Sequence, residues 1–117
     1  ILKASRDEAF EKELYNEFFM HRTSHWLGLD VHDAGQYFED FSEQSKSKSV
    51  KFQDSNVLTV EPGCYIKPNN DVPKEFWGIG IRIEDDVLVT SKGNKVLSAS
   101  APKEITDLED IVGNLNE

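Results

Sequence analysis

The chain has a single cysteine, Cys64, among its 117 residues. One thiol excludes an intrachain disulfide, and no feature points to an oxidising compartment, so we expect a reducing, cytoplasmic location. The chain also lacks any run of roughly 18 apolar residues, the length that spans a bilayer. Its N-terminus has no basic segment followed by an apolar stretch. We therefore expect no membrane partner and no signal peptide.

Basic side chains are scarce, since 13 Lys and Arg stand against 22 Asp and Glu, for a formal net charge of -9. Nucleic-acid binding requires a basic surface, so this balance excludes a nucleic-acid partner and favours cations as ligands. A length of 117 residues suits one modest hydrophobic core. We therefore predict a single compact domain over residues 1–117.

Two segments carry helix signals. Ser5 and Glu8 form a capping box, and the apolar residues behind them recur at helical spacing, which predicts a helix over about residues 5–17. The segment PKEITDLEDIVGN has proline near its start and glycine near its end, which predicts a second helix. The polar tract over residues 32–49 lacks periodicity and is predicted to be a long surface loop.

The strand signals lie between these helices. Residues 21–31 indicate an extended segment interrupted at Gly28, and VLTVE indicates a strand that stops at a Pro-Gly turn pair. IGIRIEDDVLVT predicts a β-hairpin with an Asp-Asp turn, and GNKVLS predicts a further short strand. The expected fold class is therefore α+β, with mostly antiparallel strands and a helix near each end.

Alternation sorts the side chains of IGIRIE into an apolar and a polar side. Isoleucines 79, 81 and 83 share one side, and Arg82 and Glu84 share the other. Glu61 likewise ends the apolar strand VLTVE. A carboxylate at such a position is costly unless it is exposed, paired or bound to a metal. With His25 on a third extended segment, the set of one imidazole and two carboxylates suits a divalent metal ion.

These residues also have simpler interpretations. A glutamate at a strand end is most often solvated. A histidine in an apolar strand is most often a hydrogen-bonded core residue. Spacing alone therefore leaves the metal site and the purely structural roles both open.

Three strings in this order resemble one family: SHWLGLDVHDAG, LTVEPGCYI and GIGIRIEDDVLVT. They resemble the C-terminal half of Xaa-Pro aminopeptidases (aminopeptidase P), in the pita-bread metallopeptidase family. The resemblance runs from about residue 18 to residue 100. It implies half of a pita-bread fold, with a curved, mostly antiparallel sheet and flanking helices. Prolidase is the close alternative within the family.

The resemblance implies a metal centre. His25 matches a ligand histidine, Glu61 a ligand glutamate and Glu84 the glutamate that bridges two metal ions. Manganese is the implied metal, with two ions in the complete site and with zinc or cobalt as alternatives. Xaa-Pro peptides are the implied substrates.

The resemblance also implies residues that act on the peptide. His21 and His32 match histidines associated with substrate binding and proton movement, and Arg82 matches an arginine that supports the pocket. The proline nitrogen must be protonated as the peptide bond breaks, and His32 or Glu61 suits the role of that acid. His21 suits the role of a hydrogen-bond donor to the developing oxyanion.

The sequence departs from the family pattern in two ways. It contains no D-x-T-R string, the context of two aspartate ligands that lie upstream in the family. We therefore expect this chain to be half of a catalytic domain, whose missing partner is the N-terminal half. Alone, it should be inactive and should bind one metal ion weakly or none. Arg22 also stands where the family more often has glycine, which puts the loop geometry at His21 in doubt.

A different class of function stays open, because some proteins of this architecture bind peptides or proteins without catalysis. The joint presence of His25, Glu61 and Glu84 favours the peptidase. Half of a domain exposes apolar surface that the other half normally covers. We therefore expect the isolated chain to form a homodimer.

Overall fold

The structure is a computed structural model that describes residues 2–40, 42, 47–69 and 71–113. The chain divides into two compact units, each made of two separate stretches of sequence. Unit 1 comprises Ile1–Thr23 with Glu61–Glu84, and unit 2 comprises Ser24–Val60 with Asp85–Glu117. The single domain expected over residues 1–117 stays a prediction.

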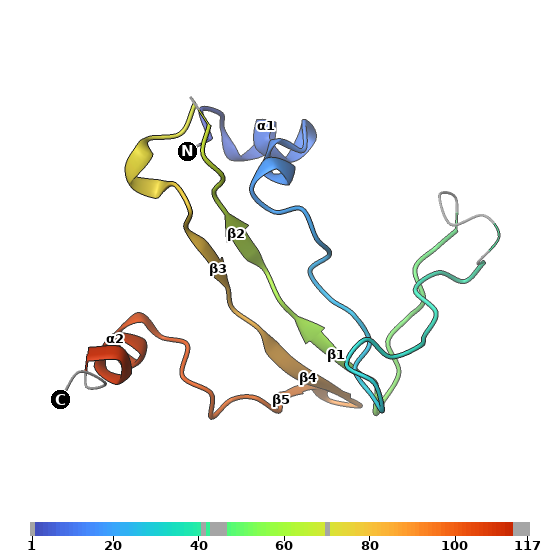
Figure 1. Cartoon of the computed structure of the whole chain (residues 1–117). Coiled ribbons are helices and arrows are strands. Elements are labelled where there is room, and N and C mark those ends of the chain that lie inside the picture. Colours follow the sequence, from blue (N-terminus) through green and yellow to red (C-terminus); the bar gives the residue numbers. More distant parts are fainter. Residues whose placement is uncertain (1, 41, 43–46, 70, 114–117) are drawn as a thin grey trace. The chain divides into compact units, whose positions relative to one another are not determined.

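Unit 1 contains a two-stranded antiparallel sheet. Strands β2 (Gly63–Tyr65) and β3 (Gly80–Arg82) lie side by side (Figure 1), with Gly63 opposite Arg82 and Tyr65 opposite Gly80. The turn predicted at the Pro-Gly pair was wrong, because β2 begins at this glycine and the Pro62 carbonyl accepts a hydrogen bond from the Ile83 N–H at 3.3 Å. The short 3-10 helix η2 (Lys74–Phe76) lies between the two strands in sequence.

The N-terminal helix of unit 1 is shorter than predicted. Helix α1 (Arg6–Glu11) begins at the expected cap, where the Glu8 N–H donates to the Ser5 hydroxyl at 3.2 Å. It ends because Glu13 takes the left-handed conformation, with φ of 51°, and a 3-10 helix, η1 (Leu14–Glu17), follows. The change of direction brings the next residue, Phe18, into the core.

The core of unit 1 is small. Phe18, Ile66 and Val72 are buried together, and Trp77 packs against them. The Trp77 indole N–H donates to the Val72 carbonyl at 2.9 Å, which satisfies the polar atom of a partly buried ring. This cluster anchors the residue that follows η1 to the excursion between β2 and β3 that contains η2.

Unit 2 contains a three-stranded antiparallel sheet in the order β1-β4-β5. Its strands are β1 (Val57–Val60), β4 (Asp85–Thr90) and β5 (Gly93–Val96). Helix α2 (Ile105–Gly113) follows. The predicted strand in GNKVLS, the second helix and the α+β class are confirmed.

The predicted β-hairpin with an Asp-Asp turn was wrong. Asp85 and Asp86 lie inside β4, opposite Val60 and Thr59 of β1, while β3 pairs with β2. Both aspartates meet Ser98, a residue beyond the end of β5. The Ser98 hydroxyl donates to an Asp85 carboxylate oxygen at 2.7 Å and accepts from the Asp86 N–H at 3.0 Å.

The predicted extended segment at residues 21–31 forms no strand of its own in the described structure. Only Trp26 makes a β-bridge, to Leu58 of β1, and the Leu27 N–H donates to the Val57 carbonyl at 3.1 Å. The chain then turns back, since the Asp33 N–H donates to the Trp26 carbonyl at 3.1 Å. A glycine and polar residues beyond Leu27 favour this local loop over a longer strand.

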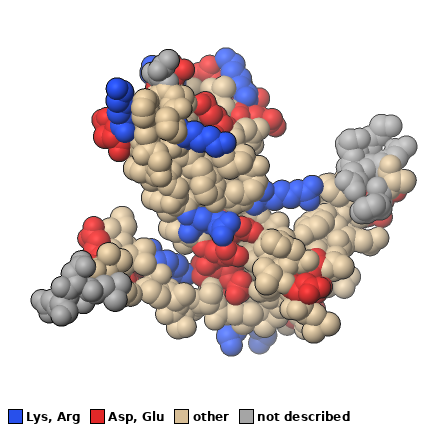
Figure 2. Space-filling view, viewed as in Figure 1, with Lys and Arg blue, Asp and Glu red and all other residues tan. Residues whose placement is uncertain are grey.

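The tract predicted as a surface loop has one β-bridge, between Phe38 and Ser49, and is otherwise irregular where it is described. Residues 41 and 43–46 of it lie outside the described part. Neither α1 nor α2 has the length and apolar character needed to cross a bilayer, and the same holds for every helix in the described ranges. On the face drawn in Figure 2, the described Lys and Arg side chains are scattered, and Asp and Glu side chains lie between several of them.

Candidate metal and peptide site

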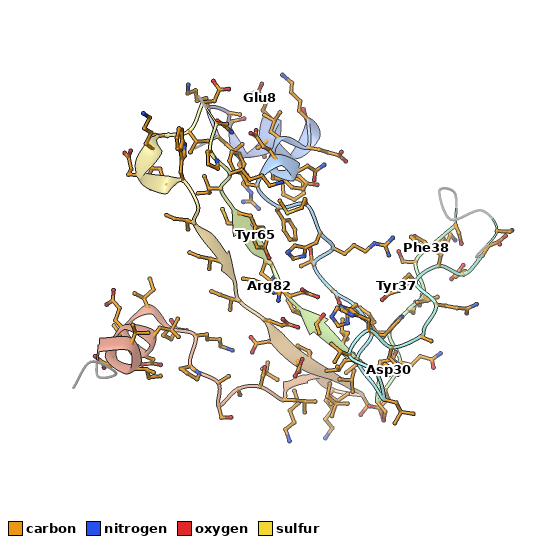
Figure 3. The ribbon with its side chains drawn as sticks, viewed as in Figure 1. Glu8, Asp30, Tyr37, Phe38, Tyr65 and Arg82 are labelled. Atoms are coloured by element: carbon orange, nitrogen blue, oxygen red, sulfur yellow. The ribbon has the colours of Figure 1, made fainter. Side chains whose placement is uncertain are left out.

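Two predicted ligand residues, Glu61 and Glu84, meet the same arginine in unit 1. Glu61 is 7% exposed, and its backbone N–H donates to the Thr23 carbonyl at 2.7 Å. An Arg82 Nη1 atom lies 3.8 Å from Oε2 of Glu61, and Arg82 Nε lies 3.7 Å from Oε2 of Glu84. Figure 3 labels Arg82 on β3. The predicted shared side of Arg82 and Glu84 is therefore confirmed, and Glu61 is paired rather than solvated.

The guanidinium of Arg82 holds these carboxylates loosely. Both distances exceed the 2.7–2.9 Å or so of a tight charge-assisted hydrogen bond, and the Arg82 side chain is 52% exposed. The pair of Arg82 with Glu84, in which both side chains are at least about a third exposed, contributes about 0–1 kcal/mol. Arg82 therefore balances the charge of Glu61 and Glu84 without fixing their oxygens, and those oxygens keep the chemistry of ligands for a hard divalent cation.

His25 is fixed to strand β1 in unit 2 through its backbone. Its N–H donates to the Thr59 hydroxyl at 3.1 Å, and its carbonyl accepts from the Thr59 N–H at 3.0 Å. Thr59 is 1% exposed, so this anchor is rigid. The His25 ring places Nδ1 2.9 Å from the Trp26 carbonyl. Since a carbonyl only accepts, Nδ1 is the donor and a neutral His25 carries its lone pair on Nε2, as metal-binding histidines commonly do.

His32 lies next to His25, with 4.3 Å between the ring centroids. Gly28 helps to explain how the loop brings His32, seven residues after His25, back to the His25 ring. A Cβ atom at Gly28 would overlap the Asp33 carboxylate, so glycine leaves room for Asp33 in this loop. The structure thus brings the two histidines of SHWLGLDVHD together within unit 2.

His21 belongs to unit 1 and uses both of its ring nitrogens. Nδ1 lies 2.8 Å from the Arg22 carbonyl, and Nε2 lies 2.7 Å from the Tyr65 hydroxyl. Arg22 takes no left-handed backbone, since Glu13 and Ser55 are the residues other than glycine with positive φ in the described chain. The backbone at Arg22 is therefore not in the conformation that would favour glycine. To donate to a peptide, His21 has to give up one of its two contacts.

Sequence reasoning missed Tyr65. It follows Glu61 by four residues and lies on β2 (Figure 3). Its position within the family string LTVEPGCYI was the one sequence feature that could have marked it as a site residue. Sequence reasoning also missed Thr59, whose position among apolar neighbours in VLTVE marked a buried residue but not the anchor of His25.

The predicted site residues divide between the units. His21, Glu61, Arg82 and Glu84 belong to unit 1, and His25 and His32 belong to unit 2. All three predicted metal ligands lie within two residues of a point where the chain passes from one unit to the other, namely 23/24, 60/61 and 84/85. A shared metal centre of these three stays a prediction.

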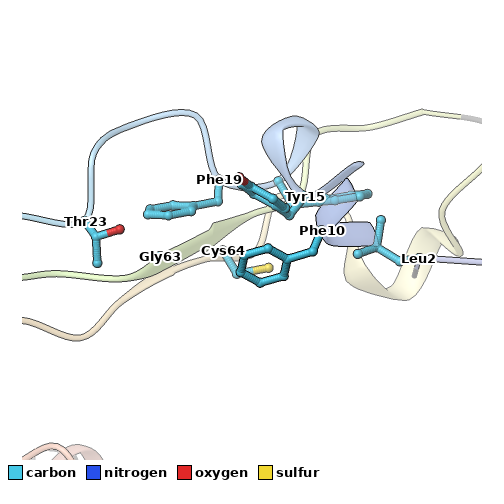
Figure 4. Close-up of a pocket in the computed structure, with 8 residues that line it drawn as sticks. Leu2, Phe10, Tyr15, Phe19, Thr23, Gly63 and Cys64 are labelled. Atoms are coloured by element: carbon cyan, nitrogen blue, oxygen red, sulfur yellow. The ribbon is translucent and has the colours of Figure 1, made fainter. Parts of the chain in front are cut away.

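Unit 1 also has an apolar pocket of about 610 Å³ (Figure 4). Its lining includes none of the predicted site residues. Aromatic side chains dominate it, and the residues that line it are Leu2, Phe10, Tyr15, Phe18, Phe19, Thr23, Gly63 and Cys64. The pocket therefore offers contact to apolar groups and no cluster of metal ligands.

Comparison with known proteins decides the family. Residues 2–91 match the model of metallopeptidase family M24. The chain belongs to this family. It is 47% identical over 112 residues to a Xaa-Pro aminopeptidase of Haemophilus influenzae, which covers 96% of this chain and 24% of the relative.

Solved M24 structures also resemble the chain. Aminopeptidase P of Escherichia coli with the inhibitor Pro-Leu has a TM-score of 0.81 and 44% identity, over 99% of this chain and 25% of that one. A zinc-substituted form of the E. coli enzyme in complex with product has a TM-score of 0.78 and 47% identity, over 93% of this chain and 23% of that one. The piece of a pita-bread fold predicted from the sequence is thus confirmed. The chain spans about a quarter of the length of these M24 relatives.

Proposed function

We propose that this M24 chain supplies His25, Glu61 and Glu84 to the metal centre of a Xaa-Pro aminopeptidase. The observation that carries the proposal is the pairing of Glu61 and Glu84 with one guanidinium, in a chain 47% identical to a Xaa-Pro aminopeptidase. Glu61 is buried, so its charge requires a cation nearby. Arg82 supplies part of that charge, and a divalent ion would supply the rest.

The donor set fits a divalent metal. One imidazole nitrogen and two carboxylates are ligands that Mn²⁺, Zn²⁺ and Co²⁺ accept. Support for zinc as an alternative comes from the zinc-substituted E. coli relative. We propose Mn²⁺ with Zn²⁺ or Co²⁺ as alternatives, two ions in the complete site, and one ion or none in this chain. Such a metal lowers the pKa of its bound water and polarises a carbonyl.

The remaining residues bind and move protons. We propose that His32, which is exposed beside His25, holds the proton that the proline nitrogen needs when the peptide bond breaks. Glu61 is the alternative acid. Arg82 lies beside both Glu61 and Glu84 and offsets part of their negative charge.

We assign peptide hydrolysis to a protein longer than these 117 residues, because the chain lacks the D-x-T-R string and spans about a quarter of its relatives. Its partner is the N-terminal half of the catalytic domain, and its substrates are Xaa-Pro peptides. A cytoplasmic location stays a prediction from the single cysteine.

Isothermal titration calorimetry, in which metal ions are added to this chain, tests the proposal. We expect weak Mn²⁺ or Zn²⁺ binding that Glu61→Gln and Glu84→Gln each abolish. The matched control is Glu75→Gln, which changes an exposed glutamate of η2 and leaves binding unchanged. Metal binding that survives Glu61→Gln and Glu84→Gln contradicts the proposed centre.

Hydrolysis is then measured on a version extended toward the N-terminus by the protein's own coding sequence. We expect Xaa-Pro tripeptides to be cleaved by the extended version and not by the 117-residue chain. Cleavage of Xaa-Pro dipeptides alone identifies a prolidase instead. An extended version that binds peptide without cleaving it identifies a binding module.

A further inference from the structure

We propose that Tyr65 is the positioning residue of His21, and that Gly63 provides the space in which Tyr65 does so. The Tyr65 hydroxyl lies 2.7 Å from Nε2 of His21, and both side chains belong to unit 1. The role of this pair toward a peptide rests on the proposed function. The geometry of the pair does not.

The two contacts of His21 determine its tautomer. The Arg22 carbonyl can only accept, so Nδ1 at 2.8 Å must carry a proton. In the neutral ring Nε2 is then an acceptor, and the Tyr65 hydroxyl must donate to it. The Phe19 ring meets the imidazole edge-on at 4.8 Å between centroids and restricts its rotation. Removal of the Tyr65 hydroxyl therefore removes the hydrogen bond to Nε2 seen among the described residues.

The position of the Tyr65 ring depends on glycine. A Cβ atom at Gly63 would lie 2.7 Å from both Cε2 and the hydroxyl oxygen of Tyr65 and 2.9 Å from Cζ. The ring thus occupies the place of the missing side chain two residues earlier on the same face of β2. Gly63 has no positive φ, so space and not backbone conformation explains the glycine.

Gly80 offers a matched comparison. It lies opposite Tyr65 in the register of β2 and β3, and a Cβ atom there would lie 3.4 Å from Cδ1 of the ring, an ordinary contact. Gly63→Ala should therefore push the outer end of Tyr65 away from His21, whereas Gly80→Ala should leave it in place. The atoms that must move at Gly63 are the far end of a side chain, so the substitution is compatible with folding.

The test is the ring nitrogen spectrum of the chain labelled with ¹⁵N-histidine, recorded at about pH 8, where imidazole is ordinarily neutral. The chain has three histidines, and loss of one ring in His21→Gln assigns the signals of His21. We expect a protonated Nδ1 and an unprotonated Nε2. Tyr65→Phe and Gly63→Ala should both shift the Nε2 signal and lower the fraction of the Nδ1–H tautomer.

Two controls isolate the effect. Gly80→Ala and Cys64→Ala, which changes the residue between Gly63 and Tyr65, should leave the His21 signals unchanged. Unchanged His25 and His32 signals show that each variant is folded. A protonated Nε2 in the parent chain overturns the proposal, as do His21 signals that stay the same in Tyr65→Phe and Gly63→Ala.

Activity provides a separate readout. In the N-terminally extended version, Tyr65→Phe and Gly63→Ala should lower kcat/KM for a Xaa-Pro peptide to a similar extent, about five-fold, as expected for one hydrogen bond. Gly80→Ala should not. An extended version without any hydrolysis contradicts the proposed function, while the spectra still decide the relationship between Tyr65 and His21.

Discussion

The ammonium group of Lys103 lies 2.7 Å from both carboxylate oxygens of Asp85. This bidentate contact fixes the segment before α2 to strand β4, and the Ser98 hydroxyl joins it at 2.7 Å. The hydrogen bond from Lys103 is the main cause that lowers the pKa of Asp85 below its ordinary value of 3.8, and Ser98 adds to it.

The lowered pKa of Asp85 predicts a pH dependence of stability. A carboxyl group with a depressed folded pKa contributes its full stability well above its ordinary pKa of 3.8 and loses it as the pH falls through the lower folded value. Asp85→Asn and Lys103→Met should therefore lower the urea midpoint at neutral pH. The difference from the parent chain should shrink below pH 3.8. Asp107→Asn, on α2, is the control, and a midpoint difference independent of pH contradicts the assignment.

Arg82 and a divalent metal should substitute for each other as cations beside Glu61 and Glu84. Arg82→Met should lower the free energy of unfolding by about 0.5–1 kcal/mol in a chelator, the range of an exposed ion pair. The loss should be smaller with Mn²⁺ present, because the metal balances the same carboxylates. Thermal unfolding of both chains with and without metal measures the coupling. An equal loss under both conditions would show that Arg82 and the metal act on different groups.

Thr59 should control how firmly His25 is held. Thr59→Val keeps the shape of the side chain but removes the acceptor for the His25 N–H, which is expected to cost about 1–3 kcal/mol. We expect metal affinity to fall with stability, as measured by calorimetry and urea unfolding. Thr106→Val, on exposed α2, is the control. Unchanged stability in Thr59→Val would mean that this contact is replaced by another.

Gly28→Ala should separate the two histidines of unit 2. The new Cβ atom overlaps the Asp33 carboxylate, and an overpacked site of this kind typically costs about 1–3 kcal/mol. Because the loop brings His32 to His25, we also expect the ring signals of both to shift. Gly113→Ala, with no atom within 4 Å of its Cβ position, is the control. Sharp, unshifted ring signals in Gly28→Ala would contradict this role of the loop.

The exposed isoleucines of unit 1 should promote self-association of the isolated chain. Ile79, Ile81 and Ile83 are 38%, 56% and 45% exposed. Apolar surface of this kind marks interfaces, so we predict that the rest of the catalytic domain covers this face in the longer protein and that a second copy covers it when the chain is alone. Light scattering should show a homodimer that Ile81→Lys weakens, whereas Leu29→Lys in unit 2 does not. A monomer at high concentration removes this prediction.

The sequence was a good guide to elements whose signals are local. The Ser5 cap, the strand in VLTVE and helix α2 follow from short-range patterns, and the structure has all three. The errors occur where pairing between distant segments decides the outcome. Asp85 and Asp86 look like a turn in sequence, but their partners, Ser98 and strand β1, are invisible to a local pattern.

The candidate site shows the same division. Alternation alone placed Arg82 beside Glu84, and the three family strings pointed to His25 and Glu61. The contact between His21 and Tyr65 spans 44 residues and could not be read from spacing. Glu13 is a further case, because its left-handed backbone ends α1 at a residue type that gives no such signal.

The glycine beneath the Tyr65 ring has an evolutionary consequence. A side chain at position 63 should displace the Tyr65 ring from His21, so we expect it mainly in lineages where position 65 has already exchanged its ring for something smaller. The two sites should thus mutate in a fixed order, the tyrosine first, and a homologue with alanine at the first position and tyrosine at the second should be rare.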